Sequence, residues 1–302
     1  MKKITNLLLM LLLLMVAACE KTDDTQDLEE EIFNPGDKKV GLVLSGGGAK
    51  GAAEIGALKV IDQKGIKIDY ISGTSIGAIM GALYAAGYTP TELEEFFGGI
   101  SKDQGKNSLY IRTILSNLLE AKGVSTFDDL KIPFRCVVAD TKELKEVVLS
   151  EGSVLDAVMA SSAIPYIYSN VEIDDHIYVD GGFYNNLPVD VVKEMGAEYT
   201  LVVDLRQNDE SFVPAYYEPL IKEALKTDLG LAMLGNAADL VKDYFKNRPD
   251  KPKYEANKQM ADTYIHPNLA GYDALSFGAD NVREMVEIGQ TAAEPKLVIP
   301  SK

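Results

Sequence analysis

The chain has 302 residues, of which 46% are hydrophobic and 25% are charged, and its formal net charge at pH 7 is −16. This excess of acid argues against nucleic-acid binding and against electrostatic docking on anionic lipid, because both require clustered positive charge. The hydrophobic fraction can build a core, and the length lies within the range of a single α/β domain.

The first residues have the pattern of an export signal. Two lysines precede an apolar run over 7–16, which is too short to span a bilayer. The run ends in Val-Ala-Ala-Cys at Cys19, which resembles the lipobox of bacterial lipoproteins, where signal peptidase cuts before an acylated cysteine. We therefore expect removal of 1–18 and attachment of Cys19 to a membrane of the bacterial cell envelope, on its periplasmic or surface face. The alternative is an ordinary secretory signal with an accidental cysteine.

Residues 19–37 are polar and acidic and contain few side chains that could be buried. We expect a flexible tether with a reach of about 25 Å. The remaining residues, 38–302, are predicted to form one globular domain.

Strand and helix patterns alternate along this domain. Strands are expected at 39–44, 68–72, 134–139, 146–149, 177–179, 200–204 and 263–266. Helices are expected at 49–63, 76–86, 90–97, 107–121, 153–161, 188–195 and 279–293. This order predicts an α/β fold with a doubly wound, mainly parallel sheet between helices. A helical insertion at 214–261 interrupts the alternation of strands and helices. We favour a pair of helices on the flank of the sheet over a lid or a lipid-contacting element.

A Gly-x-Ser-x-Gly motif occurs where the second strand gives way to a helix. Gly73 and Gly77 flank Ser75 at the positions where side chains would collide as strand and helix approach. This context predicts a nucleophile elbow with Ser75 exposed at a helix N-terminus, where the helix dipole favours a developing anion.

A glycine-rich turn follows the first strand and opens the first helix. Its backbone N–H groups could converge on one negative oxygen, so Gly46, Gly47 and Gly48 are the candidate oxyanion hole. Lys50 and Gly51 complete the turn; Lys50 is interpreted as a surface charge at the helix start that could instead face a lipid phosphate.

Asp180 ends a strand and precedes Gly181 and Gly182, which allow a sharp turn and leave the carboxylate at the edge of the sheet. The chain contains two histidines, His176 and His266, and neither belongs to a motif that would orient it toward Ser75. Asp180 is therefore the candidate base.

Two other interpretations remain open. Ser75, Asp180 and His266 stand in the chain order of an α/β-hydrolase triad. The glycine turn also satisfies a dinucleotide-binding fingerprint with Asp69 as the ribose contact, which would suit a non-catalytic nucleotide-binding lipoprotein. Against this, Asp69 falls near the beginning of its strand.

The three motifs in this order resemble the patatin-like phospholipase family over most of 39–204. The resemblance implies a serine lipid acyl hydrolase of the phospholipase A or esterase type, with a Ser75–Asp180 dyad and a lipid or acyl-ester substrate. Segments 160–165 and 185–188 also have the family form. The hydrolase domain would be 38–302, with no cofactor and no metal. Cys136, which lies in a predicted strand, is interpreted as a packed thiol.

Overall fold

The computed structural model describes residues 33–207, 211, 213 and 217–299. The signal segment 1–18, Cys19 and the tether before residue 33 lie outside these residues. The chain divides into two units, 1–30 and 31–302, and every described residue belongs to the second. Among the described residues, no helix is both long and apolar enough to cross a membrane.

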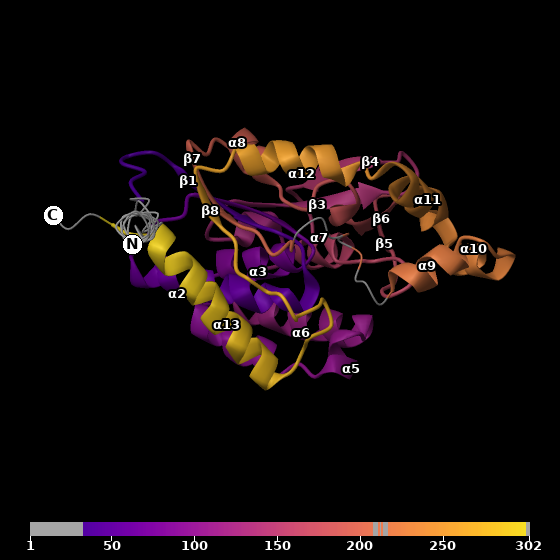
Figure 1. Ribbon diagram of the computed structural model, residues 1–302, viewed down its shortest axis with the longest axis horizontal. Helices are drawn as coiled ribbons and strands as arrows, with labels where there is room; N and C mark the ends of the chain where they lie inside the picture. Colours follow the sequence, from indigo (N-terminus) through magenta and orange to yellow (C-terminus); the bar gives the residue numbers. More distant parts are fainter. Residues whose placement is uncertain (1–32, 208–210, 212, 214–216, 300–302) are drawn as a thin grey trace, which may run out of the picture. The chain divides into compact units, whose positions relative to one another are not determined.

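An eight-stranded sheet runs through the domain in the order β5-β6-β3-β2-β1-β7-β8, with β4 paired to β3 (Figure 1). Its strands are β1 (Val40–Leu44), β2 (Tyr70–Thr74), β3 (Phe134–Asp140), β4 (Lys145–Leu149), β5 (Val171–Ile173), β6 (His176–Asp180), β7 (Tyr199–Val203) and β8 (Thr263–Ile265). Strands β3, β2, β1, β7 and β8 are parallel, whereas β4, β5 and β6 are antiparallel to their neighbours. The predicted mainly parallel sheet is confirmed.

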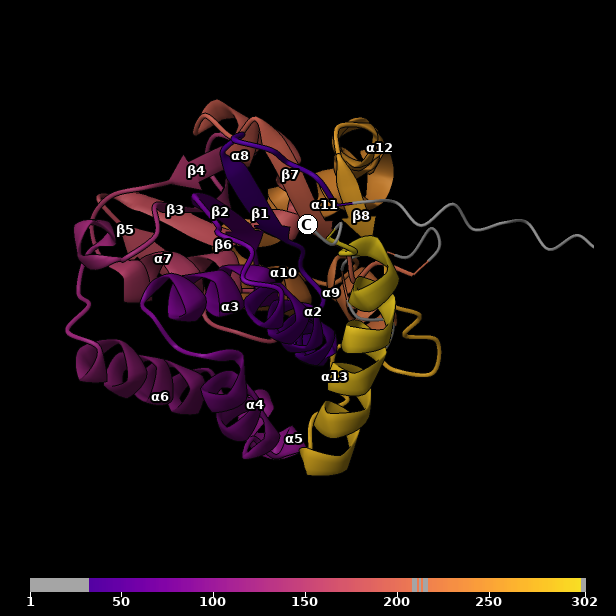
Figure 2. The same cartoon turned by 90° about the vertical axis from the view of Figure 1, so that its left-hand side faces the viewer.

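Helices cover both faces of the sheet (Figures 1 and 2). One face carries α2 (Ala52–Gln63), α3 (Ile76–Ala85), α7 (Val154–Ser161) and α13 (Ala279–Ala293). Outside this layer lie α4 (Pro90–Gly98), α5 (Lys102–Gly105) and α6 (Ser108–Ala121). The opposite face carries α8 (Val189–Glu194) and α12 (Asp250–Gln259). This arrangement confirms the doubly wound α/β fold.

Local sequence signals set the ends of two outer helices. The Thr89 side chain accepts the Glu92 N–H, and the Glu92 carboxylate accepts the Thr89 N–H at 2.7 Å, which forms a capping box at the start of α4. The Asn107 side chain accepts the Tyr110 N–H at 3.0 Å and caps α6. Gly123, at φ 72°, turns the chain away after α6.

The globular domain begins before the predicted boundary at residue 38. Phe33 is 4% exposed and packs edge-on against Tyr199 at a centroid distance of 5.4 Å. Its N–H donates to the Val298 carbonyl at 2.9 Å. The acidic residues around Phe33 gave no sign in the sequence that it is buried. The predicted end of the tether at residue 37 is therefore too late in the chain.

The predicted insertion contains four α-helices instead of a pair. These are α9 (Glu218–Ala224), α10 (Asp228–Leu234), α11 (Ala238–Asn247) and α12, while 214–216 lie outside the described residues. The buried side of α9 to α11 forms a second core with Phe183, and the Phe183 and Tyr244 rings meet edge to face at 5.2 Å. On α12, the Tyr254 hydroxyl donates to the buried Asp204 carboxylate at 2.5 Å. The favoured interpretation, helices packed on the flank of the sheet, agrees with these contacts.

The contact between α2 and α13 depends on close backbone approach. A Cβ at Gly289 would lie 2.0 Å from the Ala53 carbonyl oxygen, whereas a Cβ at Gly98 in α4 would meet its nearest neighbour at 3.9 Å. We predict that Gly289→Ala destabilises the domain by about 2 kcal/mol, or about 5 °C in Tm. Gly98→Ala is the matched control and leaves the Tm unchanged or slightly raised, because alanine favours helix. Equal melting temperatures for the two variants would contradict this account of the interface.

Candidate active site

Ser75 occupies a strained turn between β2 and α3. Its backbone has φ 55° and ψ −123°, a conformation that non-glycine residues rarely adopt. The flanking glycines allow the turn: a Cβ at Gly73 would lie 2.4 Å from the Gly77 carbonyl oxygen, and a Cβ at Gly77 would lie 2.2 Å from that of Leu44. The elbow geometry therefore follows from backbone packing that only glycine permits at these positions.

A serine from another helix supports this turn. The Ser75 N–H donates to Ser161 Oγ at 2.9 Å, and the Ser161 hydroxyl donates to the Val137 carbonyl at 2.6 Å. Ser161 ends α7 and Val137 lies in β3, so the elbow is tied to the strand beside it. Residues far apart in the chain thus fix the backbone of Ser75.

Asp180 meets Ser75 directly. The Ser75 hydroxyl donates to Asp180 Oδ2 at 2.6 Å, and the Gly182 N–H donates to Oδ1 at 2.8 Å. A Cβ at Gly181 would lie 2.3 Å from the Val137 carbonyl oxygen, so this position also needs a glycine. The two side chains singled out as nucleophile and base lie within hydrogen-bonding distance.

The Asp180 carboxyl group is fully buried. Burial raises its pKa from the usual 3.8 to about 7, while the hydrogen bonds from Ser75 and Gly182 oppose part of that rise. A base whose pKa lies near neutrality can accept a proton and return it without a large cost in either direction.

The glycine turn lies over Ser75, but its three amides are not equivalent. The Gly46 N–H donates to the Asn186 carbonyl at 3.2 Å, so this amide is already engaged. The amides of Gly47 and Gly48 donate to no acceptor among the described residues. Gly48, at φ 59°, lines the same pocket as Ser75. The Gly46 amide therefore already has a partner, and the amides of Gly47 and Gly48 are left as the candidate donors.

Lys50 departs from its expected surface position. It lies in a 3-10 turn, Gly48–Gly51, and is only 8% exposed. The turn packs beneath Ala274, whose carbonyl accepts the Ala49 N–H at 3.0 Å. Gly51 allows close contact with α3, because a Cβ there would lie 2.4 Å from Ile76 Cγ1.

The residues required by the alternative interpretations have other partners. The Nε2 atom of His266 lies 2.6 Å from the Arg206 carbonyl oxygen, and the Nδ1 atom of His176 lies 2.6 Å from Asp140. Asp69 precedes β2 and accepts the Val40 N–H at 3.0 Å, at the end of the sheet opposite the glycine turn. The structure therefore brings neither His266 to Ser75 nor Asp69 to the glycine turn.

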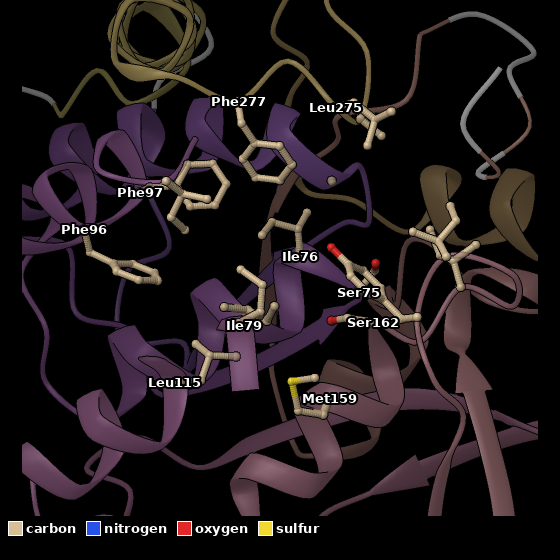
Figure 3. A pocket seen from close by; sticks show the side chains of 17 residues that line it. Ser75, Ile76, Ile79, Phe96, Phe97, Leu115, Met159, Ser162, Leu275 and Phe277 are labelled. Atoms are coloured by element: carbon tan, nitrogen blue, oxygen red, sulfur yellow. The ribbon is translucent and has the colours of Figure 1, made fainter. Parts of the chain in front are cut away.

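An apolar pocket opens beside Ser75 (Figure 3). Ile76 and Ile79 of α3 lie next to the serine, while Phe96 and Leu115 lie on the side of the pocket away from it. The remaining lining includes Phe97, Ile100, Ile111, Met159, Ser162, Ile164, Ile167, Tyr168, Ala274, Leu275 and Phe277. Such a lining suits a hydrocarbon chain.

The sequence motifs identified none of the outer wall of this pocket. Residues from α4, α6 and 274–277 form that wall. The available signal was the apolar side of the predicted helix at 107–121, which indicated burial but not its purpose. Segment 274–277 has no helix or strand pattern that could have marked it.

A possible metal-ligand group occurs elsewhere in the described chain. Ligand atoms of Asp140, Glu143 and His176 lie within 4.8 Å of one another. Asp140 accepts the N–H groups of Lys142 and Glu143, at 2.8 and 2.9 Å, so an ordinary turn accounts for its position.

Cys136 is fully buried in β3, and burial raises the pKa of its thiol.

The sequence profile of the patatin-like phospholipase family matches residues 42–193, a range that contains the elbow, the glycine turn and Asp180. The chain belongs to the patatin-like phospholipase family. It is 30% identical over 197 residues to the patatin-like phospholipase domain-containing protein 7 of Mus musculus, covering 60% of this chain and 14% of that protein. It is 31% identical over 196 residues to the neuropathy target esterase sws of Drosophila melanogaster, with the same coverage. This patatin-like chain therefore spans about one seventh of these relatives.

A solved structure shares the patatin-like fold. The crystal structure of VipD from Legionella pneumophila aligns with a TM-score of 0.51 and 13% identity, covering 85% of this chain and 66% of that chain. At this identity the likeness concerns the fold alone.

The buried Asp180 carboxylate predicts a pH-dependent effect on stability. An acid whose pKa is about 7 when folded and 3.8 when unfolded loses stability as pH rises from about 4 to 7, because the folded state must retain the proton or bury the charge. We predict that Asp180→Asn raises the free energy of unfolding at pH 8 by up to about 4 kcal/mol, and with it the Tm. At pH 4 the substitution should have little effect.

Asp140→Asn is the matched control. Burial alone would raise the pKa of Asp140, but N–H donors from Glu143 and Lys142 together with His176 lower it. Its replacement should therefore reduce stability at pH 8. A lower Tm at pH 8 for Asp180→Asn than for the wild type would contradict the assignment of Asp180 as a costly buried charge.

Proposed function

We propose that this protein is a serine lipid acyl hydrolase of the phospholipase A or esterase type, in which Ser75 is the nucleophile and Asp180 the general base. The single observation that carries the proposal is the 2.6 Å hydrogen bond between Ser75 Oγ and Asp180 Oδ2 beside an apolar pocket. Membership of the patatin-like phospholipase family and the esterase named among the relatives support a lipid ester substrate.

In the first half-reaction, Asp180 accepts the Ser75 proton as Oγ attacks the ester carbonyl carbon. The carbonyl oxygen becomes negative and is held by the Gly47 and Gly48 amides, aided by the N-terminal field of α3. The C–O bond to the alcohol then breaks, and protonated Asp180 returns the proton to the departing oxygen. The product is an acyl ester on Ser75.

In the second half-reaction, Asp180 accepts a proton from a water molecule that attacks this acyl ester. The same amides stabilise the negative oxygen, and the Asp180 proton returns to Ser75 Oγ as the fatty acid leaves. The hydrogen bond from Gly182 keeps the carboxylate oriented throughout, because it occupies the oxygen that does not face Ser75. One carboxyl group therefore serves both halves without a histidine.

We further propose that acylation of Cys19 holds the enzyme on a bacterial envelope membrane, where its substrate resides. The support is the lipobox-like sequence that ends at Cys19. Metabolic labelling with a palmitate probe in the expressing bacterium should mark the wild type and not Cys19→Ser. Labelling of both proteins would rule out this anchor.

The catalytic proposal predicts the rates of three variants on p-nitrophenyl butyrate. Ser75→Ala should lower kcat/KM at least about 10³-fold, and Asp180→Asn should lower it by a similar factor because a positioned base contributes about 10² to 10⁴. His266→Ala should keep the wild-type rate, since its Nε2 atom is engaged with the Arg206 carbonyl.

Each contrary result has a defined meaning. Equal rates for wild type and Ser75→Ala would remove the enzyme proposal. Loss of activity in His266→Ala, with an unchanged Tm, would favour a triad over the dyad.

A further inference from the structure

Helix α10 presents an apolar side to solvent. Leu229 is 74% exposed and Met233 is 59% exposed. With exposed Ala232 between them, they stand at positions i, i+3 and i+4, so the three side chains share one side of the helix. The opposite side of α10 contributes Leu234 to the second core. Packing of the insertion therefore accounts for one side of α10 and leaves the other unexplained.

This apolar side adjoins one wall of the apolar pocket beside Ser75, which we call the acyl pocket. Met233 and Leu234 line a shallow groove together with the segment 166–170, which includes the polar residues Ser169 and Asn170. Ile167 and Tyr168 also line the pocket beside Ser75. The segment 164–170 is thus a shared wall, with the acyl pocket on one side and α10 on the other. Figure 1 shows α9 and α10 projecting at one end of the domain, beyond β5 and β6.

Asp228 at the start of α10 is charged, whereas the segments that line the groove are not. No residue from Leu229 to Ala238 is charged, and the same holds from Ala157 to Val171, in a chain of which 25% of the residues are charged. Tyr166 is 38% exposed at the junction, and tyrosine suits the boundary between water and hydrocarbon because its ring is apolar and its hydroxyl polar. We define Tyr166, Leu229, Ala232 and Met233 as the α10 patch.

We propose that the α10 patch docks on a lipid bilayer and holds the entrance of the acyl pocket against the membrane surface; this rests on the proposed lipid hydrolase function. A few apolar side chains suffice to anchor a protein in the outer part of a bilayer, whereas a stable protein interface buries about 800 Å² on each partner. The shared wall also favours lipid, because Ile167 and Tyr168 line both the groove beside α10 and the apolar pocket beside Ser75. The formal net charge of −16 predicts that the attraction is apolar and not electrostatic.

The test measures binding of the protein, produced without its signal segment and with Cys19→Ser, to phosphatidylcholine vesicles. Ser75→Ala is included so that no lipid is hydrolysed during co-sedimentation. We expect this protein to bind, and the binding to persist in about 1 M salt, where the screening length is about 3 Å. Leu229→Glu combined with Met233→Glu should lower the partition coefficient of the protein onto the vesicles at least about tenfold, because two apolar side chains no longer insert.

Ile299→Glu is the matched control. Ile299 is 44% exposed and lines a depression with Phe33 and Lys39, at the amino end of β1. Its substitution adds one negative charge, against two in the double variant, at an exposed apolar position away from the patch, and vesicle binding should not change. Equal loss in the control and the double variant would overturn the proposal, because it would reflect charge alone.

A second measurement separates docking from catalysis. With Ser75 restored, the double variant should show a lower ratio of vesicle phospholipid hydrolysis to dissolved p-nitrophenyl butyrate hydrolysis, at an unchanged Tm. Vesicle binding is measured independently of hydrolysis, so an inactive wild type would refute the proposed function without deciding the docking. Absence of vesicle binding by the Ser75→Ala protein would overturn the docking proposal, and self-association that the double variant abolishes would assign the patch to a second copy of the chain.

Discussion

The hydrogen bond between Ser75 and Asp180 joins the ends of two strands that are not neighbours in the sheet. Strand β3 lies between β2, which leads into Ser75, and β6, which ends at Asp180. Val137 of β3 contacts both sides: its carbonyl accepts the Ser161 hydroxyl and closely faces Gly181. The candidate site can form because Gly181 approaches this carbonyl without a side chain, while the Ser161 side chain links the same carbonyl to the Ser75 N–H.

The same geometry explains why the site opposes stability. Ser75 has a backbone conformation that is unfavourable for a side chain, and the Asp180 carboxylate is removed from water. The burial of apolar side chains in the surrounding core, including Ile71 and Leu83, offsets this unfavourable free energy. The insertion adds to this support, since Tyr244 of α11 packs on Phe183, three residues after Asp180. A carboxyl group in such surroundings has a pKa near neutrality and can act as a base without help from a histidine.

Much of the fold could be predicted from the sequence because its signals are local. Apolar runs marked the parallel strands, and helical spacing marked the helices at 49–63 and 107–121. The glycines at 73, 77 and 181 identified positions of close backbone approach. What could not be predicted depends on distant contacts: Phe33 anchors against Tyr199, and Asn186 engages the Gly46 amide. Strand β5 and helix α5, of 3 and 4 residues, were not predicted.

The acyl pocket illustrates the same limit. Its walls come from α3, α4, α6, α7 and the 274–277 segment, and each alone reads as ordinary core. The meeting of Ser75 and Asp180 could be foreseen from short motifs, whereas the shape of the pocket beside them arises only when these segments pack together. The apolar side of α10 is a similar case, because only the folded structure shows that it lies beside segment 164–170.

The most direct test of the central claim is the pH dependence of covalent capture of Ser75 by a fluorophosphonate, followed by peptide mass spectrometry. The account predicts an adduct on Ser75, formed at a rate that rises with pH and levels off above about 7, as Asp180 loses its proton. The rise should be absent in Asp180→Asn. An adduct on another residue, or a Ser75 reaction whose rate and pH dependence are unchanged in Asp180→Asn, would contradict the dyad.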